Sequence, residues 1–220
     1  DVVTYTTIID GMAHSQQWQR ALDLLHTMNA DPHVKANIVT YGAAMKACSI
    51  ARQPIQVLRL FDEIVAHPKL HPDVIIYNAA LEACVALKRW ARALDLLRQI
   101  RSDPDVEADA TTYNTTIVCC GLGKRWQDAL DVFGQLKRSG LPVSIVSYNA
   151  CIKALGAAGR IEEIFQLWDE LRANNLKPDI VTYNSTFPPL GQAKRWEDAM
   201  QLFQKMKEDD VHPNTISYNC

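Results

Sequence analysis

The seven tyrosines of this 220-residue chain recur at a nearly constant interval. They are Tyr5, Tyr41, Tyr77, Tyr113, Tyr148, Tyr183 and Tyr218. Three intervals of 36 residues are followed by three of 35. A constant period of about 20 to 50 residues is typical of proteins that stack copies of one small unit, each burying its apolar side against its neighbours. The period therefore predicts a repeat array.

A second motif, five mostly apolar residues long, begins sixteen residues after each of the first six tyrosines. Examples are ALDLL at 21–25 and 93–97 and ALDVF at 129–133. The two motifs define a single repeat array over 1–220, with six full repeats, numbered 1 to 6 in chain order, and the start of a seventh. The repeat bounds are 2–37, 38–73, 74–109, 110–144, 145–179, 180–214 and 215–220.

Each repeat is predicted to form two helices. In the first half of repeat 3, Ile76, Ala80, Ala83, Cys84 and Leu87 fall on one face of a helix. Segments rich in Pro, Asn and Asp close the repeats and end the second helix. Neither helix can bury its apolar face alone. The sequence therefore predicts an all-α, right-handed α-solenoid superhelix of helix–turn–helix repeats.

Aromatic and proline residues add local expectations. Four tryptophans stand three residues before the second motif, at Trp18, Trp90, Trp126 and Trp196. We expect each to open a second helix and to be buried beneath the next repeat. Pro188 and Pro189 fall inside the first helix of repeat 6 and should kink or shorten it, which would misplace Asn184.

Composition excludes several classes of protein. The net charge is −2 and the isoelectric point is near 6.3, so the chain cannot grip nucleic acid by charge alone. No apolar run approaches the roughly 20 residues of a membrane-spanning helix. The chain starts without Met in the middle of the pattern, and we expect it to be a fragment with any targeting peptide upstream.

The sequence offers no catalytic, metal or cofactor site. Cys48, Cys84 and Cys120 occupy one equivalent place in three repeats, and no CxxC pair is present, so buried thiols are expected. His67 and His71 have the spacing of helical metal ligands, but two prolines in 66–73 exclude a regular helix there. A glycine-rich phosphate loop is absent, as is the zinc-deaminase signature. We therefore expect no enzymatic activity.

Together the motifs resemble pentatricopeptide repeats. The resemblance rests on the period of 35–36 residues, the VTYN opening at 181–184, the ALDVF block at 129–133 and the KPD ending at 177–179. It covers essentially the whole chain. Tetratricopeptide arrays, with a period of about 34 residues and a different pattern, are the nearest alternative and fit these spacings less well.

The resemblance implies binding of single-stranded RNA, one base per repeat, with each base read by two or three side chains. It places the first reader directly after the tyrosine and the second reader at the last residue of the repeat. The pairs are Thr6 with Asn37, Gly42 with Asp73, Asn78 with Asp109, Asn114 with Ser144, Asn149 with Asp179 and Asn184 with Asn214, and Asn219 opens repeat 7. An apolar wedge residue two before the tyrosine packs on the base: Val3, Val39, Ile75, Thr111, Val146, Val181 and Ile216.

The chemistry of the readers sets an expected base order. An ionised Asp only accepts hydrogen bonds and suits the N3–H of uracil, a Ser hydroxyl can donate to N3 of cytosine, and Asn can do both. By the family's code the RNA is then roughly A-N-U-C-U-Y-Y. The alternative is that these Asn and Asp residues only cap the first helices, and both roles can hold together.

Positive charge gathers at the turns between the two helices of a repeat. We call this set the basic ridge: Arg52, Lys88, Arg89, Lys124, Arg125, Arg160, Lys194 and Arg195. It serves solubility, phosphate binding or protein docking. The first helices carry Asp10, Lys46, Glu82 and Lys153, which sum to zero and offer little to phosphates.

Two functions remain open from the sequence. One is an RNA-binding repeat protein of a mitochondrion or chloroplast, acting in RNA processing, stability or translation. The other is a non-catalytic scaffold subunit of a large organellar complex, a ribosome or an energy-converting assembly, that binds protein subunits. The organelle is implied by the family resemblance alone. Neither a membrane span nor a DNA partner is expected.

Overall fold

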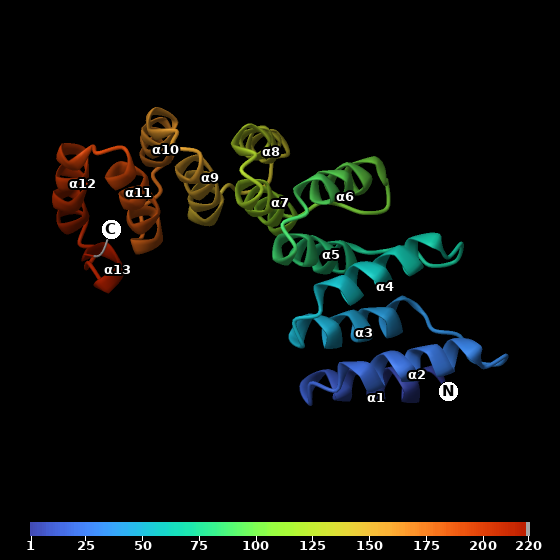
Figure 1. Ribbon diagram of the computed structural model, residues 1–220. Coiled ribbons are helices and arrows are strands. Elements are labelled where there is room, and N and C mark those ends of the chain that lie inside the picture. Colours follow the sequence, from blue (N-terminus) through green and yellow to red (C-terminus); the bar gives the residue numbers. More distant parts are fainter. Residues whose placement is uncertain (219–220) are drawn as a thin grey trace. The chain divides into compact units, whose positions relative to one another are not determined.

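The computed structural model describes residues 1–218 and consists, over that range, of α-helices joined by short turns (Figure 1). It divides into two compact units, Asp1–Thr112 and the part from Tyr113 onward. Within the described residues no strand occurs. The all-α solenoid prediction is confirmed, because twelve helices of 13 residues follow one another in pairs.

The first helix of every repeat begins at the predicted start of the repeat. These helices are α1 (Val2–His14), α3 (Ile38–Ile50), α5 (Val74–Ala86), α7 (Ala110–Leu122), α9 (Ile145–Ala157), α11 (Ile180–Gln192) and the one-turn α13 (Thr215–Tyr218). The second helices are α2 (Trp18–Ala30), α4 (Pro54–Ala66), α6 (Trp90–Ser102), α8 (Trp126–Arg138), α10 (Ile161–Ala173) and α12 (Trp196–Glu208). Each tyrosine is the fourth residue of its first helix.

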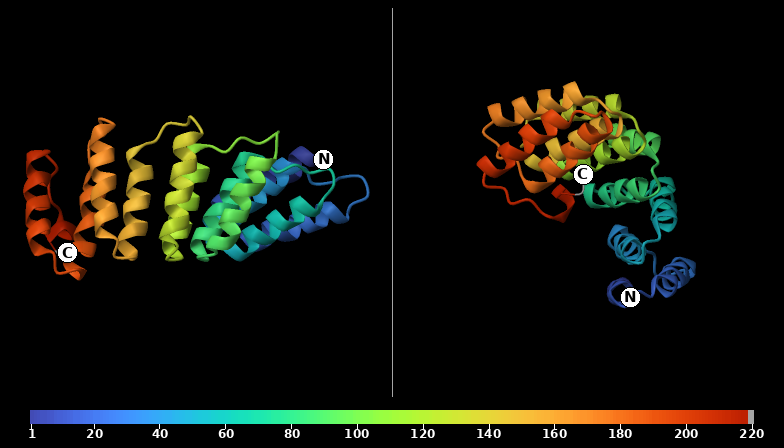
Figure 2. Two further views of the ribbon diagram at one scale, coloured as in Figure 1. Left: turned by 90° about the horizontal axis from the view of Figure 1, so that it is seen from above. Right: turned by 60° about the vertical axis from the view of Figure 1, so that its left-hand side comes forward.

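First helices pack on first helices within each unit. Helix α3 lies between α1 and α5 in the first unit, and α9 packs on α11 in the second. Each of these helices also packs on its own second helix, as both views of Figure 2 show for the pairs α3–α4 and α11–α12. Within each unit these first helices are therefore neighbours, so equivalent residues on them lie side by side.

The tyrosine rings join consecutive repeats. Where the second motif of the preceding repeat ends in an aromatic residue, as it does before Tyr77, Tyr148, Tyr183 and Tyr218, the tyrosine packs edge-on against that residue. The ring centroids are 5.2 Å apart for Phe61–Tyr77, 5.1 Å for Phe133–Tyr148 and 4.9 Å for Trp168–Tyr183. Such a pair contributes about 0.5–1.5 kcal/mol beyond the area that it buries. This contact explains why the two motifs recur in phase.

The turn between the two helices has one backbone form in most repeats. Its key residue has positive φ at Gln16, Arg52, Lys88, Lys124 and Lys194, and Gly159 takes the same place with φ of 68°. The next backbone N–H then bonds back into the first helix, as from Arg89 N to Cys84 O at 2.9 Å. Basic side chains are thereby held at one point of successive turns.

Pro188 and Pro189 do not shorten α11, so that part of the expectation is wrong. The helix has 13 residues like its neighbours. The physical reason lies in α9, where a Cβ added to Gly156 would be 2.6 Å from Cγ of Pro189. Because glycine has no Cβ, the two helices approach closely enough for the proline ring to pack between them.

The tryptophans open second helices as expected, but their full burial is not observed. Trp18, Trp90 and Trp126 are half-buried, and Trp196 is 67% exposed. At the first position of a helix one ring face is left outward. The guanidinium of Arg160, from the next repeat, covers that face of Trp126 at 4.5 Å. No helix of a following repeat covers Trp196 in the described residues.

The cysteines of the described part of the chain are buried thiols, as predicted. Cys48, Cys84, Cys119, Cys120 and Cys151 are all buried. Burial raises the pKa of Cys48 and Cys84 to about 11 and that of Cys120 to about 12. These thiols therefore stay protonated at neutral pH and fill space between helices.

Over residues 1–218, no group of three or more His, Cys, Asp and Glu side chains is arranged to hold a metal ion. Within the same range, no helix is both long enough and apolar enough to cross a membrane.

Gly156→Ala should destabilise the protein, because its Cβ would overlap the ring of Pro189. Overpacking of this kind lowers the free energy of unfolding by about 1–3 kcal/mol, measurable by urea denaturation. Gly191→Ala is the matched control: no atom lies within 4 Å of its added Cβ, so stability should hold or rise by up to about 1 kcal/mol. A Gly156→Ala loss that Pro189→Ala does not reduce would contradict this explanation.

Candidate nucleic-acid interface

The wedge residues form a row of exposed side chains on the first helices. Each is the second residue of its helix, and Val3, Val39, Ile75, Val146 and Ile216 are between 57% and 72% exposed. Val181 is 38% exposed, and Thr111 is exposed as well. Single exposed apolar residues are common on protein surfaces, but these recur at one position in every repeat. They offer an apolar contact at intervals of one repeat.

The second readers cap the first helices. The side chain of the last residue of a repeat accepts the backbone N–H of the third residue of the next first helix. This bond is 3.0 Å long for Asn37, 2.9 Å for Asp73, 2.7 Å for Asp109 and 2.8 Å for Asp179. The capping role is confirmed, and it fixes each second reader at the start of a helix.

The two readers of a repeat meet in repeats 3, 5 and 6. The amide of Asn78 donates to Asp109 at 3.2 Å, and that of Asn149 donates to Asp179 at 3.0 Å. In repeat 6 Asn184 donates to Asn214 at 3.2 Å, so the expectation that the prolines misplace Asn184 is wrong. The structure therefore brings together pairs that are about thirty residues apart in sequence.

A third polar group, which sequence analysis missed, accompanies these pairs. It is the hydroxyl of the third residue of the next first helix, and its members are buried: Thr40, Thr112, Ser147, Thr182 and Ser217. We call this place the hydroxyl position. In repeat 3 the hydroxyl of Thr112 donates to Oδ1 of Asn78 at 2.8 Å. The signal in the sequence was the Ser or Thr that directly precedes most of the tyrosines.

Repeats 1, 2 and 4 differ from this arrangement. In repeat 1 the hydroxyls of Thr6 and Thr40 share a hydrogen bond of 2.8 Å. Repeat 2 has no first-reader side chain at Gly42. In repeat 4, which is fully described, no hydrogen bond joins Asn114 to Ser144, and Oδ1 of Asn114 is buried without a partner.

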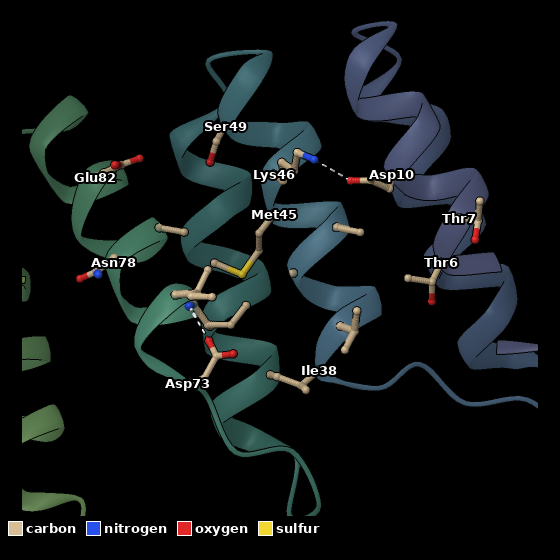
Figure 3. A pocket seen from close by; sticks show the side chains of 16 residues that line it. Thr6, Thr7, Asp10, Ile38, Met45, Lys46, Ser49, Asp73, Asn78 and Glu82 are labelled. Carbon is tan, nitrogen blue, oxygen red and sulfur yellow. Dashed lines mark hydrogen bonds and ion pairs between the residues drawn. The ribbon is translucent and has the colours of Figure 1, made fainter. Parts of the chain in front are cut away.

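A groove of about 860 Å³ crosses the first helices of the first unit. It is lined by side chains of α1, α3 and α5, including Thr6, Asp73 and Asn78 (Figure 3). The wedge residues Val39 and Ile75 also line it. The groove is open at Gly42, where α3 has no side chain, and it collects reader positions of three consecutive repeats.

The groove carries little free positive charge. Lys46 donates to Asp10 at 2.8 Å, and this bond holds the pKa of Asp10 below its ordinary value (Figure 3). Asp73 and Glu82 add two further carboxylates to the lining. The groove therefore suits a ligand that presents hydrogen-bond donors and apolar faces more than one that presents bare phosphates.

Asp179 stays ionised at neutral pH. Burial opposes its ionisation, but the backbone N–H and hydroxyl of Thr182 and the amide of Asn149 more than offset that effect, so the pKa of Asp179 is lowered. Its carboxylate can only accept hydrogen bonds. The second reader of repeat 5 is thus chemically suited to a donor such as the N3–H of uracil.

The basic ridge is partly neutralised. Three of its five arginines pair with carboxylates in the first turns of second helices: Arg125 with Asp128 at 2.6 Å, Arg195 with Asp198 at 2.5 Å, and Arg160 with Glu163. Arg195 also reaches Glu162 at 2.7 Å. Arg52 and the three lysines sit instead at the tips of the turns, at the positive-φ position. They are the ridge charges best placed to meet a phosphate.

Family models of known proteins match most of this chain. A model described as "Pentatricopeptide repeat domain" matches residues 95–158 and 166–220. The chain belongs to the pentatricopeptide repeat family. A "PPR repeat family" model matches 1–50 and 143–188, and a "PPR repeat" model matches 39–67. The search of curated proteins gives no match.

Solved pentatricopeptide repeat structures share the fold. PPR10, a protein from maize, is similar in its complex with an 18-nt psaJ RNA element, with TM-score 0.86 and 24% identity over 98% of this chain and 31% of that chain. PRORP2 from A. thaliana has a TM-score of 0.73 and 14% identity, over 84% of this chain and 40% of that chain. The PPR domain of Arabidopsis thaliana PRORP1, in complex with tRNA, has a TM-score of 0.66 and 15% identity, over 80% of this chain and 91% of that chain. The present chain spans about a third of PPR10.

Asp179→Ala should lower the free energy of unfolding at pH 7 by about 0.5–2 kcal/mol, because the cap of α11 is lost. The pKa of Asp179 is lowered from 3.8 in the fold, so its contribution is present above that value and is lost as pH falls through the folded pKa. Urea denaturation should thus show a smaller difference at about pH 3. Asp169→Ala, an exposed site on α10, is the control, and an equal loss there would contradict the capping role.

Proposed function

We propose that this chain binds single-stranded RNA, with one nucleotide taken by each repeat. The observation that carries the proposal is the pairing of an exposed wedge residue with a reader pair at the same place on consecutive first helices. A base has an apolar face and a polar edge. The wedge row meets the face, and the reader pair meets the Watson–Crick edge, which is free only in single strands.

The readers supply the specificity in this proposal. Asp109 and Asp179 accept the N3–H of uracil in repeats 3 and 5, while the hydroxyl of Ser144 can donate to N3 of cytosine in repeat 4. Thr6 with Asn37 takes adenine, repeat 2 is unread, and repeats 6 and 7 take pyrimidines. The expected order is A-N-U-C-U-Y-Y. Asn219, the first reader of repeat 7, lies outside the described residues.

The family supports this assignment. PPR10 and the PPR domain of PRORP1 form complexes with an RNA element and with tRNA, respectively. By the same analogy the chain acts in a mitochondrion or chloroplast, in RNA processing, stability or translation, and without catalysis of its own. It acts by occluding or remodelling the strand that it holds.

A scaffold function is the second candidate, and one observation favours it. Lys46 in the groove and three arginines of the basic ridge are bonded to carboxylates of the chain itself. Phosphate contacts supply much of the affinity of most RNA-binding proteins. A surface whose cations are internally paired is equally suited to bind protein subunits of an organellar complex.

Fluorescence anisotropy with short labelled RNAs separates the two candidates. Binding to an RNA that contains A-N-U-C-U-Y-Y, and weaker binding to its complement, is expected. Absence of binding to every RNA tested, at low as well as moderate salt, would overturn the proposal in favour of the scaffold function.

Ser144→Asp should change the base preference at the fourth nucleotide from cytosine to uracil. The substitution replaces a possible donor by an acceptor-only carboxylate, which repels N3 of cytosine and accepts N3–H of uracil. The change should be about 1–3 kcal/mol, the size of other base-edge contacts. It is measured with RNAs that differ only at that base.

Gln127→Glu is the matched control for Ser144→Asp. It adds the same charge to the same repeat, but on the exposed face of α8, away from the first helices. Its preference at every nucleotide should stay as in the unmodified protein. A uniform loss of affinity in both variants would mean that Ser144→Asp acts through charge alone.

The lysines of the basic ridge should contribute to the salt dependence of RNA binding. Replacing Lys88, Lys124 and Lys194 by Ala is expected to flatten the plot of log K against log salt by about 0.7 for each phosphate that is no longer neutralised. Arg125→Ala should change the slope less, because Asp128 already binds that guanidinium. An unchanged slope in the triple variant would leave the lysines as solubility residues.

A further inference from the structure

The reader pair of repeat 3 shares a hydroxyl with the following repeat. In repeat 3, the hydroxyl of Thr112 donates to Oδ1 of Asn78 at 2.8 Å and lies 2.9 Å from Oδ1 of Asp109. It also accepts the backbone N–H of Asp109 at 3.3 Å. Thr112 is fully buried. Both readers of repeat 3 are therefore held by one side chain that belongs to repeat 4.

Repeat 6 shows the same closed set of bonds. The hydroxyl of Ser217 donates to Oδ1 of Asn184 at 2.7 Å, while Nδ2 of Asn184 donates to Oδ1 of Asn214 at 3.2 Å. Ser217 lies 3.2 Å from Oδ1 of Asn214 as well. Repeats 3 and 6 thus share one geometry. In both, Oδ1 of the first-reader asparagine accepts from the hydroxyl, and Nδ2 of that asparagine donates to the second reader.

Repeat 5 keeps the hydroxyl but uses it differently. Thr182 donates to Oδ1 of Asp179 at 2.8 Å, and Oδ1 of Asn149 is buried without a partner. The amide of Asn149 still donates to Asp179 at 3.0 Å. In repeat 5 the hydroxyl therefore bonds to the second reader, Asp179. The residue at the hydroxyl position can thus hold a reader pair by bonding to the first reader or to the second.

Repeat 2 is the exception. Its hydroxyl position holds Ile76, which is 3% exposed, and its first reader is Gly42. A Cβ added to Gly42 would lie 3.4 Å from Cδ1 of Ile76. An apolar side chain therefore occupies the place where the other repeats keep a polar contact, and an amide introduced at Gly42 alone would face it.

We propose that the hydroxyl position is a specificity-determining position for the base bound by the preceding repeat, and that Ile76 together with Gly42 is the reason why repeat 2 does not discriminate bases. The inference rests on the RNA-binding function proposed above. The residue acts through the readers and touches no base, so it is a positioning residue. Its hydroxyl fixes which end of the asparagine amide faces the second reader.

The effect follows from the geometry that recognition needs. A recognition group must be held within about 0.5 Å of its productive place by neighbours that are themselves locked. Without the hydroxyl, Oδ1 of the half-buried Asn78 loses the donor that holds it, and such a group moves to find water or another partner. The amide then no longer presents one fixed edge to the base.

Thr112→Val tests the position by loss, because valine keeps the shape and removes the hydroxyl. Discrimination of uracil over cytosine at the third nucleotide should fall by about fivefold or more, the lower end of the worth of a base-edge contact. Discrimination at the fifth nucleotide should not change. Thr112→Ser keeps the hydroxyl and should keep the discrimination. If Thr112 acted through packing alone, Thr112→Val, which keeps the shape, would keep the discrimination and Thr112→Ser, which removes a methyl group, would lose it.

Repeat 2 tests the position by gain. Gly42→Asn with Ile76→Thr creates the set Asn, Asp, Thr that repeat 3 carries. The double variant should prefer uracil at the second nucleotide by about fivefold or more, whereas Gly42→Asn alone and Ile76→Thr alone should show no preference there. Equal preference in Gly42→Asn and in the double variant would overturn the inference.

The outcomes separate this inference from the proposed function. If the unmodified chain binds no RNA, the function fails and the inference fails with it. If it binds RNA and discriminates uracil at the third nucleotide, but Thr112→Val keeps that discrimination, the inference alone fails. Should Thr112→Val unfold, as circular dichroism would show, the repeat 2 variants decide the question.

Discussion

The contact between a tyrosine and the aromatic residue that ends the second motif of the preceding repeat, made by Tyr77, Tyr148, Tyr183 and Tyr218, is the constraint on which the packing of those repeats depends. Tyr148 illustrates it: its ring packs on Phe133 of repeat 4, and its hydroxyl donates to Glu170 of repeat 5 at 3.0 Å. Burial and the Glu170 carboxylate raise the pKa of Tyr148 to about 12, so the hydroxyl stays a donor at physiological pH. One side chain thereby sets the register of a repeat against the repeat before it.

That register brings capping and recognition onto the same residues. Because first helices lie side by side, the residue that caps one helix meets the fifth residue of the helix before it. Asp179 shows the consequence, since the bonds that stabilise the start of α11 are the same bonds that keep its carboxylate ionised. Under the proposed RNA-binding function, stability and base selection are coupled at these second readers, and a substitution there is expected to change both.

The sequence predicted the features that depend on local spacing. The period, the helix starts and the place of each tyrosine follow from residues within one repeat, and all were correct. The features it missed arise where two repeats touch. Neither the room that Gly156 leaves for Pro189 nor the bond from Thr112 to Asn78 is visible in spacing, because each joins side chains more than thirty residues apart. The pairing of Arg195 with Glu162 is hidden for the same reason, whereas the pairs Arg125–Asp128, Arg160–Glu163 and Arg195–Asp198 lie three residues apart and could have been read from the sequence.

The shared hydroxyl position also limits how such arrays can be recombined. The group of residues that we propose to serve one base runs from wedge to hydroxyl position, over 39–76 for repeat 2 and over 75–112 for repeat 3, so neighbouring groups overlap. No single crossover point leaves every group whole. A graft made at the start of a first helix replaces the residue at the hydroxyl position that serves the preceding repeat. A cut before α5, for example, would replace Ile76, which serves repeat 2. Shuffling of repeats is therefore neutral only between parents that carry the same residue there.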